Sequence, residues 1–328
     1  MRFLSARVKL CAVGGSIVRD RIPRRRNSMN FTTCIRGTLT LADGAWGTEL
    51  QKLGAPLGAC LDEWNLLKPE LVRQVAESYV QAGSKVILTN TFRANPISLA
   101  PHGLDGQCAA INSAGVKISR GAAGREALVF ASIGPSGKML VTKEVTPEQL
   151  HEAFSAQAHA LAEESPDALL IETMIDVTEA KIAAAAALET GLPVIVSFVY
   201  DSGKNRDRTI MGATPEQVAT ALVSEGVHGI GANCGVGARE YVAICKRLVA
   251  ACRLPIWIKP NAGLPEIVGG VAKYRTTPEE FAEAAKEFAN AGATFVGGCC
   301  GTSPDFIRAL ARDAAFRAGS DLAKASEE

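Results

Sequence analysis

The chain has 328 residues, of which 47% are hydrophobic and 21% are charged. This composition is typical of a globular protein with a sizeable buried core, and it excludes a disordered or collagen-like chain. The sequence has no run of about 18 or more apolar residues, so we expect no membrane span. The net charge of +1 argues against a protein that binds nucleic acid through bulk charge.

The charge is distributed unevenly along the chain. Residues 1–30 hold eight Lys and Arg against one acid, whereas the remainder holds 27 basic and 33 acidic residues, a net charge of −6. We therefore expect a basic leader over residues 1–36, outside the folded domain, and a C-terminal tail over 319–328. Three interpretations of the leader stay open: a misassigned extension of a chain that starts at Met29, an organellar transit peptide, or a basic tail that contacts nucleic acid.

From residue 38 onward, short apolar runs alternate with Ala-rich amphipathic stretches. The runs predict eight strands, at 38–43, 85–90, 128–133, 168–172, 194–198, 229–233, 256–259 and 294–297. The stretches predict eight helices, at about 69–82, 106–120, 147–164, 176–190, 215–225, 238–252, 278–291 and 304–316. Four of these helices begin at a hydroxyl residue followed by proline, a pattern typical of capped helix starts, at Thr146, Thr214, Thr277 and Ser303.

Eight strands alternating with eight helices predict an α/β fold, a single-domain (β/α)8 TIM barrel over residues 37–318. An open doubly wound sheet is the alternative. No Gly-x-Gly-x-x-Gly motif follows the first strand, which argues against the dinucleotide-binding form of that alternative.

Nine cysteines are present, an odd number in a long chain, and this argues against a disulfide framework. We expect a reducing compartment and a cytoplasmic protein. Cysteines within predicted helices are interpreted as small buried hydrophobic residues, namely Cys108, Cys245 and Cys252.

Three cysteines stand apart because they lie at the C-terminal ends of predicted strands, where a barrel forms its active site. Cys234 follows the sixth strand, and Cys299 and Cys300 follow the eighth within Gly-Gly-Cys-Cys-Gly. Three clustered sulfurs indicate a zinc site with one open position. The alternative is a pair of buried thiols on a glycine-rich turn. No histidine lies at a strand end, so we expect activation of a substrate thiol rather than of water.

Two carboxylates lie at strand ends as well, Asp43 after the first strand and Glu172 after the fourth. They could act as acid and base, or they could bind a substrate ammonium group. A metal-activated thiol needs no separate base, so the ammonium interpretation is preferred. The alternative for each carboxylate is that it caps a neighbouring helix.

Six motifs in order resemble the homocysteine S-methyltransferase domain, which also occurs in cobalamin-dependent methionine synthase and in betaine–homocysteine methyltransferase. The resemblance covers roughly residues 37–316. The motifs are Asp-Gly-Ala-Trp-Gly-Thr from Asp43, Thr-Asn-Thr-Phe from Thr89, Glu-Thr-Met from Glu172, Gly-Ala-Asn-Cys from Gly231, Pro-Asn-Ala-Gly from Pro260, and Gly-Gly-Cys-Cys-Gly-Thr from Gly297.

The resemblance implies a zinc-dependent homocysteine S-methyltransferase in which Cys234, Cys299 and Cys300 hold one Zn²⁺ and homocysteine sulfur takes the open position. No catalytic side chain is implied beyond the activated substrate thiolate. The resemblance further implies a substrate site in which the two carboxylates bind the amino group, the backbone from Gly44 onward lies near the carboxylate, and asparagines support the site. This substrate-binding set is Asp43, Gly44, Ala45, Asn90, Glu172 and Asn233.

The methyl donor stays open among S-methylmethionine, S-adenosylmethionine, betaine and methylcobalamin. Trp46 either stacks on a cationic donor or packs on a neighbouring loop. Because folate and cobalamin modules are not expected in this chain, cobalamin would act only through a partner protein. The alternative function is therefore the homocysteine-activating subunit of a split methionine synthase with a separate corrinoid protein. A third possibility is a zinc barrel that binds another thiol or is inactive.

Overall fold

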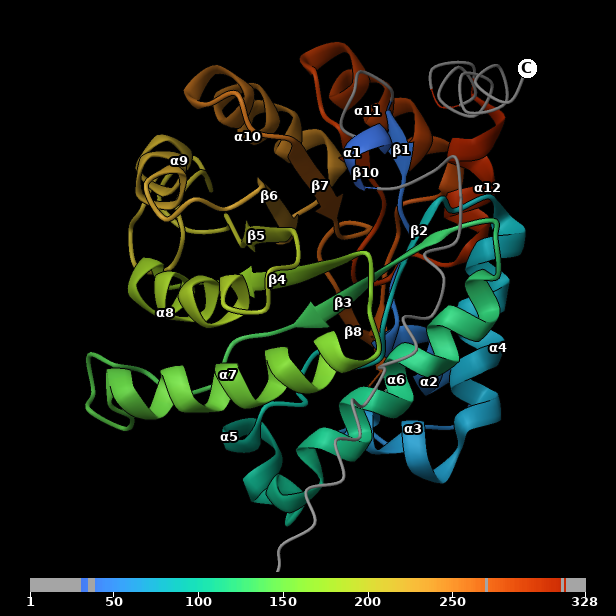
Figure 1. Ribbon diagram of the computed structural model, residues 1–328. Helices are drawn as coiled ribbons and strands as arrows, with labels where there is room; N and C mark the ends of the chain where they lie inside the picture. The colour runs from blue at the N-terminus through green and yellow to red at the C-terminus, as the bar shows by residue number, and fades with distance from the viewer. Residues whose placement is uncertain (1–30, 35–38, 269–270, 314–315, 317–328) are drawn as a thin grey trace, which may run out of the picture.

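The computed structural model describes residues 31–34, 39–268, 271–313 and 316. Its main sheet has eight strands, all parallel, in the order β1-β10-β7-β6-β5-β4-β3-β2. A parallel bridge between Ala42 and Val86 joins the two ends of this order. The sheet is therefore a nearly closed barrel with helices around its outside (Figure 1), and the predicted single-domain (β/α)8 fold is confirmed.

The strands lie where the apolar runs predict them. They are β1 (Thr40–Leu41), β2 (Val86–Leu88), β3 (Leu128–Ile133), β4 (Ala168–Met174), β5 (Val194–Phe198), β6 (Gly229–Cys234), β7 (Ile256–Pro260) and β10 (Phe295–Val296). The first and last are shorter than predicted, because their polar and glycine-rich ends leave the ladder for the loops of the site. At Gly297, an added Cβ would lie only 2.5 Å from the Asp43 carbonyl oxygen, so these two chain segments touch directly.

All eight predicted helices are present, with ends that differ by a few residues. They are α4 (Pro69–Ala82), α6 (Cys108–Ala123), α7 (Pro147–Glu163), α8 (Val177–Leu188), α9 (Pro215–Val223), α10 (Ala238–Ala251), α11 (Pro278–Ala291) and α12 (Pro304–Arg312). The Thr or Ser residue before each of the four helix-starting prolines caps its helix. Each threonine forms a reciprocal capping box with the third helical residue, and Ser303 accepts a bond from the Asp305 amide.

Several short elements were not predicted, because three to six residues carry too little periodicity to be recognised. Most lie in the connections after β1, β2 and β7, at the C-terminal end of the barrel. They are α2 (Gly47–Lys52), η1 (Leu61–Glu63), α3 (Trp64–Leu67), α5 (Pro96–Leu99), η2 (Ala100–His102), η3 (Asp105–Gln107) and the antiparallel hairpin of β8 (Glu266–Val268) and β9 (Val271–Lys273). These connections enlarge the mouth of the barrel.

Aromatic side chains fill the N-terminal half of the barrel interior. The rings of Phe130, Trp257 and Phe295 lie 5.5–5.9 Å apart, centroid to centroid. Phe31, from the short helix α1 (Phe31–Cys34), is buried and packs 6.0 Å from the Phe130 ring and 6.4 Å from the Phe295 ring. The predicted leader of residues 1–36 thus includes one residue that contributes to the barrel core.

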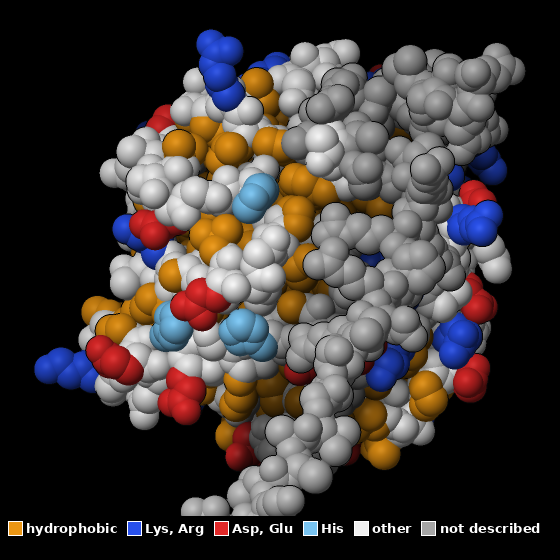
Figure 2. Space-filling view, viewed as in Figure 1, with side chains coloured by type: hydrophobic (Ala, Val, Ile, Leu, Met, Phe, Trp, Pro, Cys, Tyr) orange, Lys and Arg blue, Asp and Glu red, His pale blue; other side chains and the backbone are white. Residues whose placement is uncertain are grey.

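The expected leader segment 1–28 and the tail 319–328 lie outside the described residues. Within the described part of the chain, no helix is both long enough and apolar enough to cross a membrane. On the face shown in Figure 2, acidic and basic side chains lie interspersed. His151 and His159, both on α7, lie 3.2 and 4.0 Å from the Glu189 carboxylate, on the outer surface and away from the strand ends.

Candidate metal and thiol-substrate site

A cavity of about 420 Å³ opens at the C-terminal ends of the strands. Its wall is formed by the C-terminal ends of strands and by the loops that follow them. The strands concerned are β1, β2, β3, β4, β6, β7 and β10. Most of the predicted site residues line it together, namely Gly44, Ala45, Asn90, Glu172, Cys234, Cys299 and Cys300. Two others, Asp43 and Asn233, are fully buried behind this wall.

The three cysteines form one cluster. Their sulfur atoms all lie within 4.8 Å of one another, and the Sγ atoms of Cys299 and Cys300 are 4.0 Å apart. Three thiolates on a tetrahedral zinc ion, each with a Zn–S bond of about 2.3 Å, would stand roughly 3.8 Å from each other. The observed spacing therefore fits a zinc ion with small adjustments. In the described part of the chain, no other group of three His, Cys, Asp or Glu side chains has metal-binding spacing.

Local backbone geometry points these thiols at one another. Cys234 ends β6 in the left-handed region, with φ of 65°, which is uncommon for a residue other than glycine. The turn after β10 depends on its glycines. A Cβ on Gly298 would lie 2.5 Å from the Thr302 side chain, and one on Gly301 would lie 2.2 Å from the Tyr274 ring. Thr302 donates to the Cys299 carbonyl oxygen at 2.7 Å, which fixes the turn.

The proton affinities of the three thiols diverge because their sulfur atoms lie close together. The neighbouring Cys299 and Cys300 thiols lower the pKa of Cys234 to about 3. The same proximity raises the pKa of Cys299 to about 12 and also raises the pKa of Cys300. The cluster thus carries one thiolate readily, and a divalent cation would have to displace the other two protons.

The Asp43 carboxylate is saturated by donors from within the barrel. One oxygen is paired with the Lys259 ammonium. The other accepts from the Trp46 indole Nε1 at 2.7 Å and from the Leu88 amide at 2.7 Å. Asp43 caps no helix, and its carboxylate instead fixes a lysine, an indole ring and the end of β2.

Lys259 is a site residue that sequence reasoning missed. It is the penultimate residue of β7, its side chain is 2% exposed, and it lines the cavity. Its ammonium also lies 5.6 Å from the Trp257 ring centroid. A signal was available in the sequence. Side chains of a strand alternate between its two faces, so Lys259 lies on the same face as Trp257, two residues earlier. Because Trp257 points into the barrel, Lys259 is a charged residue on the inward face.

Glu172 is buried at the cavity wall. One carboxylate oxygen accepts from the Ser132 hydroxyl at 2.5 Å, and no other hydrogen bond to the carboxylate is present among the described residues. Burial raises the pKa of Glu172 to about 7, although the nearby Lys259 charge and the Ser132 bond oppose that rise. A buried carboxylate with an open oxygen favours a cationic ligand.

Asn233 holds the strand ends beside the cavity. Its amide exchanges two bonds with Thr173, donating to the hydroxyl at 2.7 Å and accepting from the backbone N–H at 2.8 Å. The Ser197 hydroxyl donates to the same amide oxygen at 2.7 Å. Thr173 is in the left-handed region, with φ of 63°, directly after Glu172. Asn233 therefore stabilises the backbone turn that presents Glu172.

Asn90 lines the cavity and ties its loops together. Its side-chain amide donates to the Leu61 carbonyl oxygen at 2.7 Å and to the Asn65 side chain at 3.0 Å. Asn261 ties two loops in a similar way, since its side-chain amide donates to the Gly235 carbonyl oxygen at 2.7 Å. Both asparagines tie loops together through their side-chain amides.

The small residues after β1 pack tightly for structural reasons. A Cβ on Gly44 would lie 2.8 Å from the Tyr79 ring and 2.9 Å from the Thr302 hydroxyl. The Ala45 amide already donates to that hydroxyl at 3.1 Å, and its carbonyl accepts from the Tyr79 hydroxyl at 2.6 Å. The Ala45 amide is therefore engaged within the protein. Trp46 is half-buried against the core, consistent with the packing interpretation of its ring.

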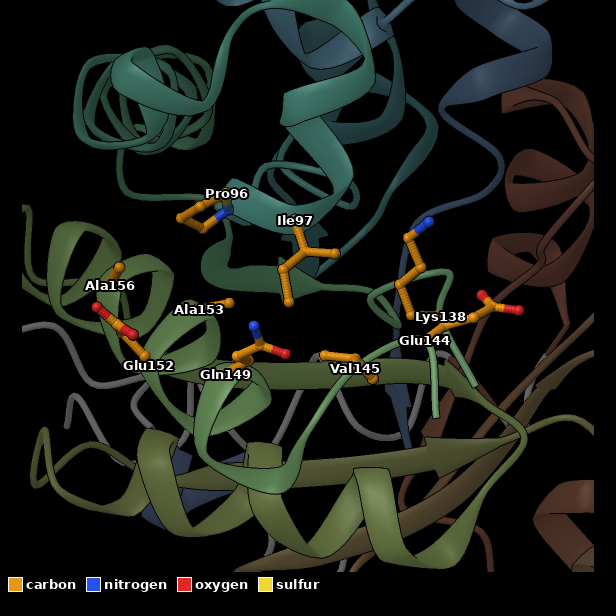
Figure 3. A pocket seen from close by; sticks show the side chains of 9 residues that line it. All are labelled: Pro96, Ile97, Lys138, Glu144, Val145, Gln149, Glu152, Ala153 and Ala156. Atoms are coloured by element: carbon orange, nitrogen blue, oxygen red, sulfur yellow. The ribbon is translucent and has the colours of Figure 1, made fainter. Parts of the chain in front are cut away.

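Other cysteines lie outside the cluster. Cys108 and Cys245 are buried in helices, and burial raises the pKa of each, to about 11 and about 12. Cys252 is half-buried at the end of α10. A second cavity, between α5 and α7, contains none of the predicted site residues (Figure 3). It is lined by Pro96, Ile97, Lys138, Glu144, Val145, Gln149, Glu152, Ala153 and Ala156.

Comparison with curated proteins finds methionine synthases of two mycobacteria. The protein of Mycobacterium tuberculosis is 30% identical over 288 residues, which cover 83% of this chain and 24% of that protein. The Mycobacterium leprae protein is 30% identical over 306 residues, which cover 87% of this chain and 25% of that protein. The chain thus spans about a quarter of the length of these relatives.

Among solved structures, the chain is similar to the homocysteine methyltransferase MmuM from Escherichia coli. The oxidized form aligns with a TM-score of 0.71 and 26% identity over 84% of this chain and 96% of that one. The metallated form aligns with a TM-score of 0.71 and 25% identity over 85% and 97%. The family model described as homocysteine S-methyltransferase matches residues 40–314. The chain therefore belongs to the homocysteine S-methyltransferase family.

Proposed function

We propose that this protein is a zinc-dependent homocysteine S-methyltransferase that forms methionine. The observation that carries the proposal is the cluster of Cys234, Cys299 and Cys300, with sulfur atoms within 4.8 Å of one another in the wall of the barrel-mouth cavity. The similar MmuM protein has a metallated form, which supports a metal-dependent enzyme. Reduced thiols in the site are consistent with a cytoplasmic enzyme.

Zinc held by these thiolates would supply a Lewis acid that lowers the pKa of a substrate thiol. In the reaction, the homocysteine sulfur attacks the methyl carbon of the donor, a C–S bond forms, and the bond from methyl to the leaving group breaks. The thiol proton leaves for solvent. We assign no side chain as general acid or base.

The substrate-binding set divides into two groups by position. Glu172, Asn90, Gly44 and Ala45 line the cavity, and Glu172 is the residue suited to bind the ammonium group. Asp43 and Asn233 lie behind the wall and hold the contacting residues in place. We propose that the domain extends over 37–318, with Phe31 as an additional core contact from the preceding segment.

Methyl transfer with defined donors tests this function. Purified protein and homocysteine are offered S-methylmethionine, S-adenosylmethionine, betaine and methylcobalamin in separate reactions, and methionine is measured together with bound zinc. Methionine from a sulfonium or ammonium donor, with one zinc per chain, supports a stand-alone enzyme. A zinc-free protein that transfers no methyl group from any of the four donors would contradict the proposal.

A second candidate function is homocysteine activation for a separate corrinoid protein, as in a split methionine synthase. Apart from Val223, the exposed large hydrophobic side chains of the described residues all lie in connections that follow strands, at the mouth end of the barrel. They are Leu57, Leu66, Leu67, Met139, Val141, Ile210, Met211, Leu264 and Ile267. Exposed apolar side chains around the barrel mouth, here called the rim, would suit a macromolecular partner if they act together.

The rim separates the two functions by experiment. Ile267→Glu and Leu57→Glu place charges on the rim without touching the cluster. Under the split-enzyme function, these variants should transfer methyl groups from a corrinoid protein at least tenfold more slowly than the wild type, with an unchanged rate from free methylcobalamin. Variants that match the wild-type rate with both donors would argue for the stand-alone enzyme.

A further inference from the structure

The proposed chemistry exposes the three cysteines of the cluster to a side reaction. All three line the cavity in which the methyl donor and homocysteine would meet. A thiolate is a nucleophile whether it belongs to the substrate or to the protein. If a cysteine thiolate took the methyl group, a C–S bond would form, the bond from the methyl carbon to the donor would break, and a neutral thioether would remain. Such a sulfur is no longer a charged metal ligand, so the enzyme would inactivate itself.

A hydrogen bond to a thiolate slows this side reaction. It favours the charged form and lowers the pKa of the thiol, and the nucleophilicity of a thiolate falls with its pKa. Two of the cysteines have amide groups beside them. The Asn233 side-chain amide lies 3.9 Å from the Cys299 sulfur. The neighbouring thiols, and after them the Gly235 backbone N–H and the Asn261 side-chain amide, lower the pKa of Cys234 to about 3.

Cys300 differs from the other two cysteines. No hydrogen bond from an amide to its sulfur is present among the described residues. The side chain beside it is Tyr274, directly after β9. A Cβ on Gly301, the next residue after Cys300, would lie 2.2 Å from the Tyr274 ring Cγ and 2.4 Å from Cδ2, so the ring covers the backbone of this turn. A phenol thus lies where the other two cysteines have amides.

The β8–β9 hairpin determines the position of Tyr274. Arg275 Nε pairs with Glu266 Oε1 at 2.6 Å across the base of the hairpin. The next residue, Thr276, lies against the segment that enters the hairpin, since a Cβ on Gly263 would lie 2.9 Å from the Thr276 hydroxyl. These two contacts follow Tyr274 directly in the chain and hold its backbone beside the cysteine turn.

The protonation state of Tyr274 suits a hydrogen-bond donor. Burial raises the pKa of its phenol, and the three nearby cysteines raise that pKa as well. The phenol therefore stays protonated near neutral pH and has an O–H to donate. Tyr274 does not line the cavity, so it takes no space from the substrates.

We propose that the Tyr274 hydroxyl donates to the Cys300 sulfur and protects this ligand from methylation, so that the methyl group passes to the substrate thiol. Tyr274 acts through Cys300 and is therefore a positioning residue, not a catalytic one. The proposal rests on the proposed function, because a cluster that never meets an electrophilic methyl group needs no such protection.

Iodomethane tests the proposal, because this small neutral electrophile reports the nucleophilicity of each sulfur without a donor-binding site. The zinc-loaded wild type and the Tyr274→Phe variant are treated with it, and peptide mass spectrometry locates and times the methylation of each cysteine. The Phe ring keeps the contact with Gly301 and lacks only the hydroxyl. We expect Cys300 to be methylated roughly threefold to tenfold faster in the variant, as for the loss of one hydrogen bond to a charged sulfur. Equal rates at Cys300 in the two proteins would overturn the proposal.

Two controls separate the hydroxyl from a general loosening of the site. Tyr200 is fully buried, and its hydroxyl has no hydrogen-bond partner in the described part of the chain, so Cys300 should react in Tyr200→Phe as in the wild type. Cys252 lies outside the cluster, and its methylation rate is the internal reference in each protein. If all three cluster cysteines react faster in Tyr274→Phe to the same extent, specific protection of Cys300 is refuted.

Zinc content distinguishes failure of this proposal from failure of the proposed function. Zinc release is followed with a chromogenic chelator during the reaction, and it should keep pace with methylation of Cys300 in Tyr274→Phe. A wild-type protein that takes up no zinc would refute the proposed function and this inference together. A zinc-loaded wild type whose Cys300 reacts as fast as that of the variant would refute the role of Tyr274 alone.

Discussion

Lys259 and Asp43 are separated by 216 residues in the sequence and form an ion pair inside the barrel, with side chains that are 2% and 0% exposed. Removing one partner of a buried pair leaves an uncompensated charge. We therefore predict that Lys259→Met lowers the free energy of unfolding by roughly 3–5 kcal/mol. The Asp43→Asn, Lys259→Met double variant should show a clearly smaller loss in the free energy of unfolding. Urea denaturation of the two variants provides the measurement, and equal losses would argue against the ion pair.

The cysteine cluster should account for all bound zinc. We predict that Cys299→Ala, Cys300→Ala and Cys234→Ala each lose most of the zinc and at least a hundredfold in methyl transfer, because each removes one of three ligands. Cys252 is half-buried at the end of α10, and Cys252→Ala is the matched control. This variant should keep its zinc and its rate of methyl transfer. Metal analysis and turnover are measured on the same samples. Full zinc in Cys299→Ala would show that the ion binds elsewhere.

Zinc binding should release protons and strengthen as the pH rises. The pKa of Cys299 is raised to about 12 and that of Cys300 is raised as well, because both thiols lie beside the Cys234 thiolate, so both are protonated near neutral pH. Since zinc binds thiolates, roughly two protons should leave per ion. Calorimetry in buffers of different ionisation enthalpy measures that number. An affinity that does not fall between pH 8 and pH 6 would be incompatible with these thiols as ligands.

Asn233 should matter to substrate binding without contacting the substrate. Asn233→Ala leaves the Thr173 amide and the Ser197 hydroxyl without their acceptor. We predict a loss of about 2 kcal/mol in stability and a higher KM for homocysteine, because the turn that presents Glu172 is released. Ser197→Ala removes only one donor, so its effect should be smaller. Thermal melts and steady-state kinetics decide this, and an unchanged KM in Asn233→Ala would refute the positioning role.

Phe31 defines how much of the N-terminal segment the barrel needs. Its ring packs against Phe130 and Phe295 at the interior of the barrel. We predict that removal of residues 1–28 leaves stability and turnover unchanged, whereas removal of 1–36 lowers stability by roughly 3 kcal/mol, the usual cost of deleting a buried Phe side chain. Phe31→Ala in the full chain is the matched control. Equal melting temperatures for both truncations would place the domain boundary at residue 37, as the sequence suggests.

The architecture could be predicted because it depends on local patterns. Strands buried on both faces are continuous apolar runs, so β3 and β5 were predicted to the residue. Thr-Pro and Ser-Pro pairs marked the starts of helices because capping is a local interaction. Short elements such as α2 and α5 were missed since their form depends on the loops they pack against, and their few residues carry no periodic signal.

The sequence by itself determined the barrel and brought Cys234, Cys299 and Cys300 to one rim, because parallel strands must end on the same side. It placed Asp43 and Glu172 at that rim as two equivalent anions. Only the tertiary structure separated them, because the partners of Asp43 come from β2, β7 and the loop after β1, whereas Glu172 keeps an open oxygen. Hydrogen-bond saturation is a property of the assembled barrel, and a residue's place along a strand does not reveal it.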